Sequence, residues 1–266
     1  TLFFYEFFPF WATLFENLGY EVVLSDKTNK RIIRQGVETV LAETCYPIKV
    51  AHGHVQNLFE KKVDYILFPS LINLKKEQPG METYCCPYVQ ALPYILKATY
   101  DFKVRGTKFL SAPVHFQKGR TALLKELDKL CQDLKISKLK LRKAFKNAEA
   151  CQEEFYRRIR LRGEEILRDL KGQKVMVVVG RPYNTCDPFL SLELSKKLRE
   201  LKCTALPLDF VPLKSPLDNY VMPNMYWKYG QKILAASEFV KNTPGIFPVY
   251  VTNFGCGPDS FILHFF

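Results

Sequence analysis

Short apolar runs alternate with segments of helical periodicity along most of this chain, and that order limits the fold more than any other feature. In the first part, the apolar runs predict strands and the periodic segments predict helices. The strands are predicted at residues 2–6, 20–26, 63–70 and 107–114, and the helices at residues 10–19, 45–61 and 87–100. Short strands that alternate with helices are typical of a parallel sheet covered on both faces. We therefore predict an α/β protein.

The last part of the chain repeats this alternation, beginning at the segment QKVMVVVGRPYN. Further helices are predicted there at residues 187–201 and 225–240, and further strands at 203–212 and 245–255. Between the two parts, a proline-free segment rich in Lys, Arg, Glu and Leu predicts two helices broken near Ile136 and Ser137.

These patterns predict three regions along the chain. The first lobe covers residues 1–115, a basic helical bridge covers residues 116–172, and the second lobe covers residues 173–266. The chain starts without Met and ends just after a motif, so we expect a fragment of a longer protein with an incomplete second lobe. In such folds, ligands bind beyond the carboxyl ends of the parallel strands.

The positive charge is concentrated in one segment. The net charge is +12, and residues 101–174 hold 20 Lys and Arg against 10 Asp and Glu. A nucleic-acid-binding module is one alternative for this segment, but its basic residues alternate with Glu and Leu and few aromatic residues are available for base stacking. A solvated helical face or a docking surface for an acidic redox partner is favoured. A non-catalytic interaction module is a further alternative.

The eight cysteines divide into two groups by their neighbours. Three lie inside helical or strand patterns. The other five, each beside Pro, Gly, Asn or Asp at a predicted element end, are Cys45, Cys85, Cys86, Cys186 and Cys256. No apolar run approaches the roughly 20 residues that span a bilayer, and the first residues lack the features of a signal peptide. We therefore expect a reducing, cytoplasmic setting in which these thiols serve metal or redox chemistry.

Three of these cysteines are expected on the same rim of the fold: Cys45, Cys86 and Cys256. Cys45 and Cys86 precede prolines at predicted helix starts, where the helix dipole favours a thiolate. Cys256 lies between two glycines that leave backbone N–H groups accessible to an inorganic group. The alternatives are incidental cysteines, a structural zinc site and a thioredoxin-like dithiol, but C-x-x-C spacings are absent.

Several motifs in order resemble those of one superfamily. They are FFYEFFPFWATLFENLGYEVVLSD, ETCYPIKVAHGHV, CPYVQALP, GRPYN followed by DP, LPLDF and NFGCGPDSFI. The chain resembles the 2-hydroxyacyl-CoA dehydratase superfamily, and more closely the domain of uncharacterised function in large CoA-substrate-specific activase proteins, relatives of the double-cubane cluster proteins. The resemblance extends over nearly the whole chain except the basic helical segment.

This resemblance implies two Rossmann-like lobes and an oxygen-sensitive iron–sulfur cluster. The cluster would receive a low-potential electron from an ATP-hydrolysing activator and pass it to a substrate, as in a reductase. The alternative is radical dehydration of a CoA thioester. The cysteines that match the superfamily are Cys45, Cys86 and Cys256, which suit a [4Fe-4S] cluster with one open iron. A double-cubane [8Fe-9S] cluster needs about six ligands, and five are reached only by including Cys85 and Cys186.

Other residues are candidates for supporting roles. His52 and Glu43 are candidate catalytic groups that could supply protons near the cluster, and His54 is expected to point away from His52. The turn that contains Gly180, Arg181 and Asn184 follows a strand and opens a helix, so it could contact an anion or substrate. Arg181 could instead pair with Asp187. Asp259 and Ser260 are expected to cap a helix beside Cys256.

Overall fold

The structure is a computed structural model that describes residues 2–76, 80–170, 172–213 and 224–266. Parts of the predicted bridge and second lobe, at residues 171 and 214–223, therefore lie outside the described residues. The chain divides into two compact units. Unit 1 contains Thr1–Lys76 and Thr83–Gln152, and unit 2 contains Glu77–Glu82 and Glu153–Phe266. The predicted bridge is thus shared between the units, with the division inside its long helix.

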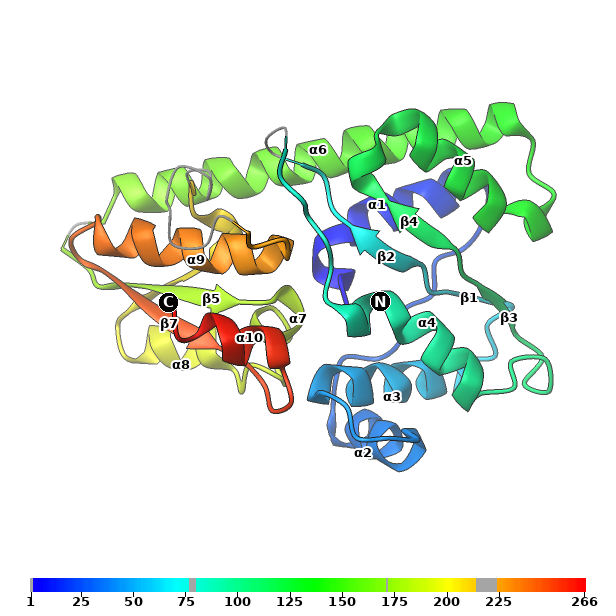
Figure 1. Ribbon diagram of the computed structural model, residues 1–266, viewed down its shortest axis with the longest axis horizontal. Helices are drawn as coiled ribbons and strands as arrows, with labels where there is room; N and C mark the ends of the chain where they lie inside the picture. The colour runs from blue at the N-terminus through cyan, green and yellow to red at the C-terminus, as the bar shows by residue number, and fades with distance from the viewer. Residues whose placement is uncertain (1, 77–79, 171, 214–223) are drawn as a thin grey trace. The chain divides into compact units, whose positions relative to one another are not determined.

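Unit 1 is built from helices around two short pairs of parallel strands (Figure 1). Strand β1 pairs with β3, and β2 pairs with β4. The helices of unit 1 are α1 (Phe4–Asn17), α2 (Lys30–Thr39), α3 (Tyr46–Glu60), α4 (Pro87–Thr99), α5 (Arg120–Leu130) and the first part of α6 (Lys138–Arg168). The strands are β1 (Tyr65–Leu67), β2 (Ser70–Asn73), β3 (Lys108–Leu110) and β4 (Pro113–His115).

Two strands predicted at the start of the chain are wrong. Residues 2–6 lead into α1, because Phe7, Trp11 and Leu14 recur at helical spacing and bury one face of that helix. Residues 20–26 form no strand, and Val23 and Leu24 are each 43% exposed, so this apolar run has no buried face. Helix α2 was not predicted. Its N-cap residue is Asn29, whose side-chain oxygen accepts hydrogen bonds from two backbone N–H groups of the first turn.

Unit 2 contains a three-stranded parallel sheet in the order β6-β5-β7. The strands are β5 (Val175–Gly180), β6 (Thr204–Pro207) and β7 (Ile246–Val251), and the helices are α7 (Pro182–Thr185), α8 (Leu194–Glu200), α9 (Lys228–Lys241) and α10 (Gly257–Ile262). The central strand β5 is almost entirely buried, as its run of valines predicts. Helices α8 and α9 lie on opposite sides of the sheet (Figure 1).

The helix predicted at residues 187–201 is shorter than expected. Asp187 accepts hydrogen bonds from the backbone N–H groups of Phe189 and Leu190, and this turn keeps the chain out of a helix. Leu192 and Glu193 then have positive φ angles of 53° and 54°, so α8 begins only at Leu194.

The predicted break in the basic segment is confirmed. Helix α5 ends at Leu130, a 3-10 turn follows, and Lys135 has a left-handed conformation before α6 begins at Lys138. The α/β class is also confirmed, with parallel pairing in each described sheet. Among the described helices, none combines the length and hydrophobicity that crossing a lipid bilayer requires.

Candidate functional site

Among the described residues, three α-helices begin with a cysteine as the N-cap residue. Cys45 precedes α3, Cys86 precedes α4 and Cys256 precedes α10, and each helix has a proline at its first or second position. Ser, Thr, Asp and Asn are the usual N-cap residues, because their oxygen atoms accept hydrogen bonds from the first turn. None of the three cysteines makes such a side-chain bond. Helix capping therefore does not explain why cysteine occupies these positions.

All three N-cap cysteines are buried thiols. Their exposed fractions are 9% for Cys45 and 7% for both Cys86 and Cys256, and none of the eight cysteines forms a disulfide bond. The backbone carbonyl of each cysteine accepts a hydrogen bond from the first turn of its helix, so the chain holds the residue firmly.

In unit 1, helices α3 and α4 bring two of these cysteines to the same end of a helix pair. Tyr100, at the end of α4, donates its hydroxyl to the backbone carbonyl of His52 at 3.0 Å, and its ring contacts Phe59. Figure 1 shows the two helices running in the same direction. Cys45 and Cys86, the N-cap residues of these two helices, consequently lie at the same end of the pair, and the rim expected for all three cysteines stays a prediction.

Cys85 is fixed through its backbone beside Cys86. Its N–H donates to the carbonyl of Ile72 in β2 at 2.8 Å, and its carbonyl accepts a hydrogen bond from the Gln90 side chain at 2.8 Å. The thiol is 3% exposed. This anchoring positions the following residue, Cys86, at the start of α4.

In unit 2, the turn after β5 meets the turn after β7. The Arg181 guanidinium donates to the Asp259 carboxylate at 2.8 Å, and both side chains are almost completely buried. The second carboxylate oxygen accepts the Thr252 hydroxyl at 3.0 Å. The strands β5 and β7 are parallel neighbours, so their carboxyl ends place these residues side by side.

Asp259 and Ser260 make contacts that differ from those expected from the sequence. Asp259 lies inside the first turn of α10 and holds Arg181, so its predicted role as a helix cap is wrong, since Cys256 is the N-cap. The Ser260 hydroxyl donates back to the Cys256 carbonyl at 2.9 Å.

The remaining members of the predicted anion-binding turn also have partners within unit 2. Asn184 donates its side-chain amide to the Asn253 side-chain oxygen at 2.8 Å. Gly180 allows a close approach of β7, because a Cβ atom there would lie 2.4 Å from the carbonyl oxygen of Val251. An anion or substrate contact at this turn stays a prediction.

The electrostatics around Cys256 favour a neutral thiol. Burial raises the pKa of Cys256 to about 12, with a further contribution from the negative charge of Asp259, while Arg181 opposes the shift. At Cys256, burial therefore outweighs the stabilisation of a thiolate by the positive end of the helix dipole. A bound cation would reverse this preference, because coordination favours the thiolate.

The candidates for proton transfer lie in different environments. His52 is fully buried, and both of its ring nitrogens lack a hydrogen-bond partner in the part of the chain that the structure describes. His54 points elsewhere, as expected, and contacts the hydroxyls of Ser25 and Thr28. The Glu43 side chain is 92% exposed and pairs with Lys49 at 2.7 Å. A catalytic role for His52 or Glu43 stays a prediction.

The buried His52 gives the protein a specific acid sensitivity. Burial lowers the pKa of His52, whereas in the unfolded chain His binds a proton near pH 6.5. The unfolded state therefore binds more protons below that pH, and stability falls as the pH decreases. We expect His52 alone to contribute a slope of up to about 1.4 kcal/mol per pH unit below pH 6.5.

Urea unfolding at pH 7.5 and at pH 5.5 measures this effect. His52→Leu should flatten the pH dependence of the unfolding free energy, and His264→Gln, a change at an exposed histidine, should leave it unaltered. An unchanged pH dependence in His52→Leu would contradict the assignment.

The candidate ligands are divided between the two units, with Cys45, Cys85 and Cys86 in unit 1 and Cys186 and Cys256 in unit 2. Cys186 ends α7, is partly exposed, and has its sulfur 3.7 Å from the Thr185 hydroxyl oxygen. Within the described ranges, no three His, Cys, Asp or Glu side chains form a group that could hold a metal ion. Joint ligation by Cys45, Cys86 and Cys256 stays a prediction.

The fold places this protein in the α/β class, with cysteines at the starts of three described α-helices. A comparison with protein families identifies its family. The chain belongs to the family described as CoA enzyme activase uncharacterised domain (DUF2229), whose model matches residues 1–211. Cys45, Cys86 and Arg181 lie inside the matched region, and Cys256 lies beyond it. No curated protein and no solved structure matches the chain.

Proposed function

We propose that this chain is the iron–sulfur part of an ATP-dependent CoA enzyme activase system of the reductase type. In this proposal, Cys45, Cys86 and Cys256 ligate one [4Fe-4S] cluster, which when bound accepts a low-potential electron and passes it on. The electron would come from an ATP-hydrolysing activator, and the acceptor would be a CoA thioester or another small molecule. The membership of the CoA enzyme activase family supports the link to an activator.

The observation that carries the proposal is the threefold repetition of a buried N-cap cysteine on a helix with proline at its first or second position. Three separate helices in two units carry the same unusual cap. Structural N-caps would be served better by Ser or Asp. Thiolates at helix starts, by contrast, benefit from the positive end of the helix dipole, and thiolates are the ligands that iron–sulfur clusters use.

The surrounding residues fit the same role through their contacts. Three thiolates bring three negative charges to the site, and Arg181 beside Cys256 supplies a positive charge that partly offsets the effects of burial and of Asp259 on the Cys256 thiol. The buried pair with Asp259 keeps this guanidinium in place at 2.8 Å. Low exposure of the cysteines limits the access of water and oxygen to the sulfur atoms.

Anaerobic reconstitution with iron and sulfide, followed by metal analysis and electron paramagnetic resonance, tests the proposal. We expect about four irons per chain in the unaltered protein. Cys45→Ser, Cys86→Ser and Cys256→Ser should each lose most of the iron, because a three-ligand cluster does not survive the loss of one thiolate. The matched control is Cys151→Ser, which changes a partly exposed cysteine within α6.

The possible outcomes separate the alternatives. About eight irons, with losses in Cys85→Ser and Cys186→Ser as well, would indicate a double-cubane cluster. Zinc without iron would contradict the redox proposal. Full retention of iron in the Cys256→Ser variant would also contradict it, since two thiolates from unit 1 would then be sufficient.

A further inference from the structure

Helix α6 carries two kinds of charged surface. Its second part is electrically balanced, because arginines pair with glutamates one turn away along the helix. The pairs are Arg157 and Arg158 with Glu154, Arg162 with Glu165, and Arg168 with Glu164. The two arginines beside Glu154 lower the pKa of that carboxyl to about 2. Four of the five arginines in this half of the helix therefore have a glutamate partner on the same helix.

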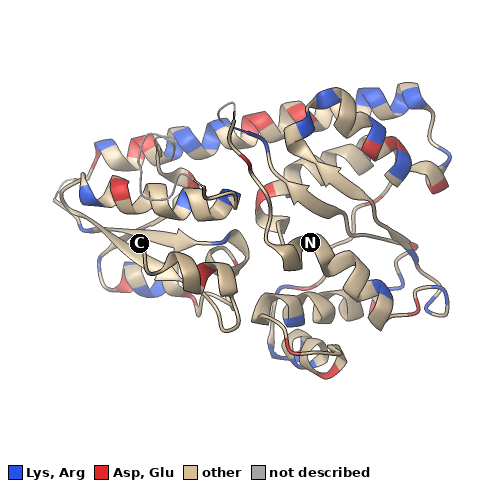
Figure 2. Ribbon diagram, in the orientation of Figure 1, with Lys and Arg blue, Asp and Glu red and all other residues tan. Residues whose placement is uncertain are grey.

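The first part of α6 and the turn before it are different. Seven exposed basic side chains lie there and at the end of α5, beside one exposed acidic residue, Asp133, and none of the seven forms an ion pair within the described residues. Lys140 donates to the Leu18 carbonyl at 2.8 Å, and we call the other six the basic patch: Lys129, Lys135, Lys138, Arg142, Lys143 and Lys146. Figure 2 shows blue segments without red between them along the first turns of α6, and alternating red and blue further along. All six lie in unit 1.

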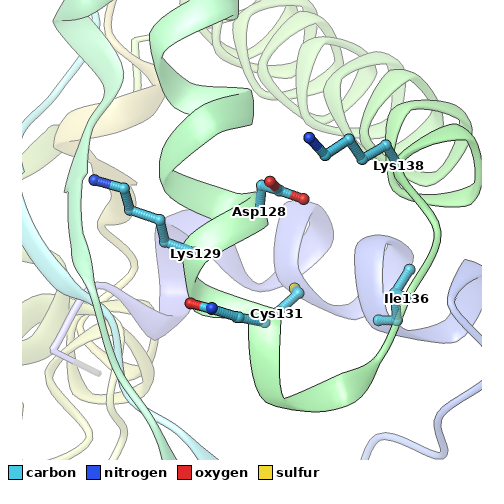
Figure 3. Close-up of a pocket in the computed structure, with 6 residues that line it drawn as sticks. Asp128, Lys129, Cys131, Ile136 and Lys138 are labelled. Carbon is cyan, nitrogen blue, oxygen red and sulfur yellow. The ribbon is translucent and has the colours of Figure 1, made fainter.

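The patch is a surface and not a pocket for a small anion. A pocket of about 390 Å³ does lie at its edge, lined by Asp128, Lys129, Cys131, Gln132, Ile136 and Lys138. In Figure 3, the Asp128 carboxylate and the Lys138 amino group reach toward each other across this pocket, while the Lys129 side chain extends away. The carboxylate would repel a small anion, and burial raises the pKa of Cys131 to about 11, which leaves a neutral thiol.

The composition of the patch favours a protein partner over a nucleic acid. Five of its six side chains are lysines, whereas arginine is the residue that binds phosphate in a bidentate manner. The only aromatic residue between residues 117 and 154 is Phe145, which is fully buried, so no ring is available for base stacking. Leu139, in contrast, is 79% exposed among the basic residues and offers the apolar contact that a protein interface uses.

From these observations we infer that the basic patch is the docking surface for a partner protein with an acidic surface. Arg142 and Lys146 are one helical turn apart, and Lys143 lies beside them, so the three present an uninterrupted positive face to solvent. Unpaired surface charges of one sign raise the rate at which an oppositely charged protein docks and orient it during encounter. The inference does not depend on the identity of the cluster or of the substrate.

The test measures binding of the full chain to fluorescently labelled poly-L-glutamate, with a random-sequence DNA duplex as the competing probe. The patch variant is Arg142→Glu/Lys143→Glu/Lys146→Glu. The matched control is Lys27→Glu/Lys30→Glu/Lys62→Glu, which makes the same change in net charge at exposed residues of the same unit. Circular dichroism and thermal unfolding establish that both variants are folded.

We expect the patch variant to bind poly-L-glutamate about tenfold more weakly, which corresponds to the loss of three exposed ion pairs. The control should lose less than about twofold, since screening limits the effect of distant charges. Equal losses in the two variants would overturn the inference, because net charge alone would then explain binding. Tighter, patch-dependent binding of the duplex than of poly-L-glutamate would also overturn it and would assign the surface to nucleic acid.

Discussion

Arg181→Met is expected to lower the free energy of unfolding of unit 2 by about 3–5 kcal/mol. The substitution removes the guanidinium that lies 2.8 Å from the Asp259 carboxylate, and the exposed fractions of the two side chains are 2% and 0%. Asp259 would keep a hydrogen bond from Thr252 but would lose the charge that balances it. A buried carboxylate without a counter-charge is among the most destabilising local changes in a protein.

The two tryptophans allow this effect to be measured in unit 2 itself. Trp11 belongs to α1 in unit 1, and Trp227 is the N-cap residue of α9 in unit 2. In a Trp11→Phe background, urea unfolding followed by tryptophan fluorescence reports on Trp227 alone. Arg162→Met is the matched control, because it removes an exposed arginine paired with Glu165 and should cost less than about 1 kcal/mol.

A second variant separates the contribution of the Arg181 charge to stability from the contribution of its packing. Arg181→Met combined with Asp259→Leu removes both charges, so it should recover much of the stability that Arg181→Met alone loses. If the single and the double variant were equally unstable, packing around Arg181 would be the cause and the buried charge would not.

Local sequence patterns predict the elements whose burial follows their own periodicity. The valine run of β5 is buried on both faces and was predicted as a strand, and the helix that starts after Cys45 was predicted from the proline in its first turn. The strand predicted at residues 2–6 was wrong because a Phe-rich sequence is compatible with either a strand or a helix. Only the packing of Phe7, Trp11 and Leu14 decides in favour of α1.

The parts of the candidate site that depend on local sequence were predicted, and those that depend on the pairing of strands were not. A proline one or two residues after a cysteine predicts a helix start from local sequence alone, and the structure places Cys45, Cys86 and Cys256 at such starts. The partnership of Arg181 with Asp259 depends on β5 and β7 being neighbours in the sheet. No local pattern contains that information, although both residues follow predicted strands and the rule for strand ends could have suggested it.

Gly53→Ala is expected to destabilise unit 1 by about 3 kcal/mol, at the upper end of the cost of overpacking. Helices α2 and α3 cross with their backbones in contact at Gly36 and Gly53. A Cβ atom on Gly53 would lie 1.8 Å from the carbonyl oxygen of Ile32, and one on Gly36 would lie 2.0 Å from that of Lys49. Backbone atoms cannot rotate away as a side chain can, so the two helices would have to separate.

The sign of the effect distinguishes this contact from ordinary helix propensity. Within a helix, Gly→Ala normally stabilises by up to about 1 kcal/mol, because alanine loses less conformational entropy. Gly257→Ala, at the first residue of α10 in unit 2, is the control, since no atom of the described residues lies within 4 Å of the added methyl group there. We expect Gly36→Ala and Gly53→Ala to lower the urea midpoint and Gly257→Ala to leave it nearly unchanged. A stabilised Gly53→Ala variant would show that the backbones of α2 and α3 do not cross this closely.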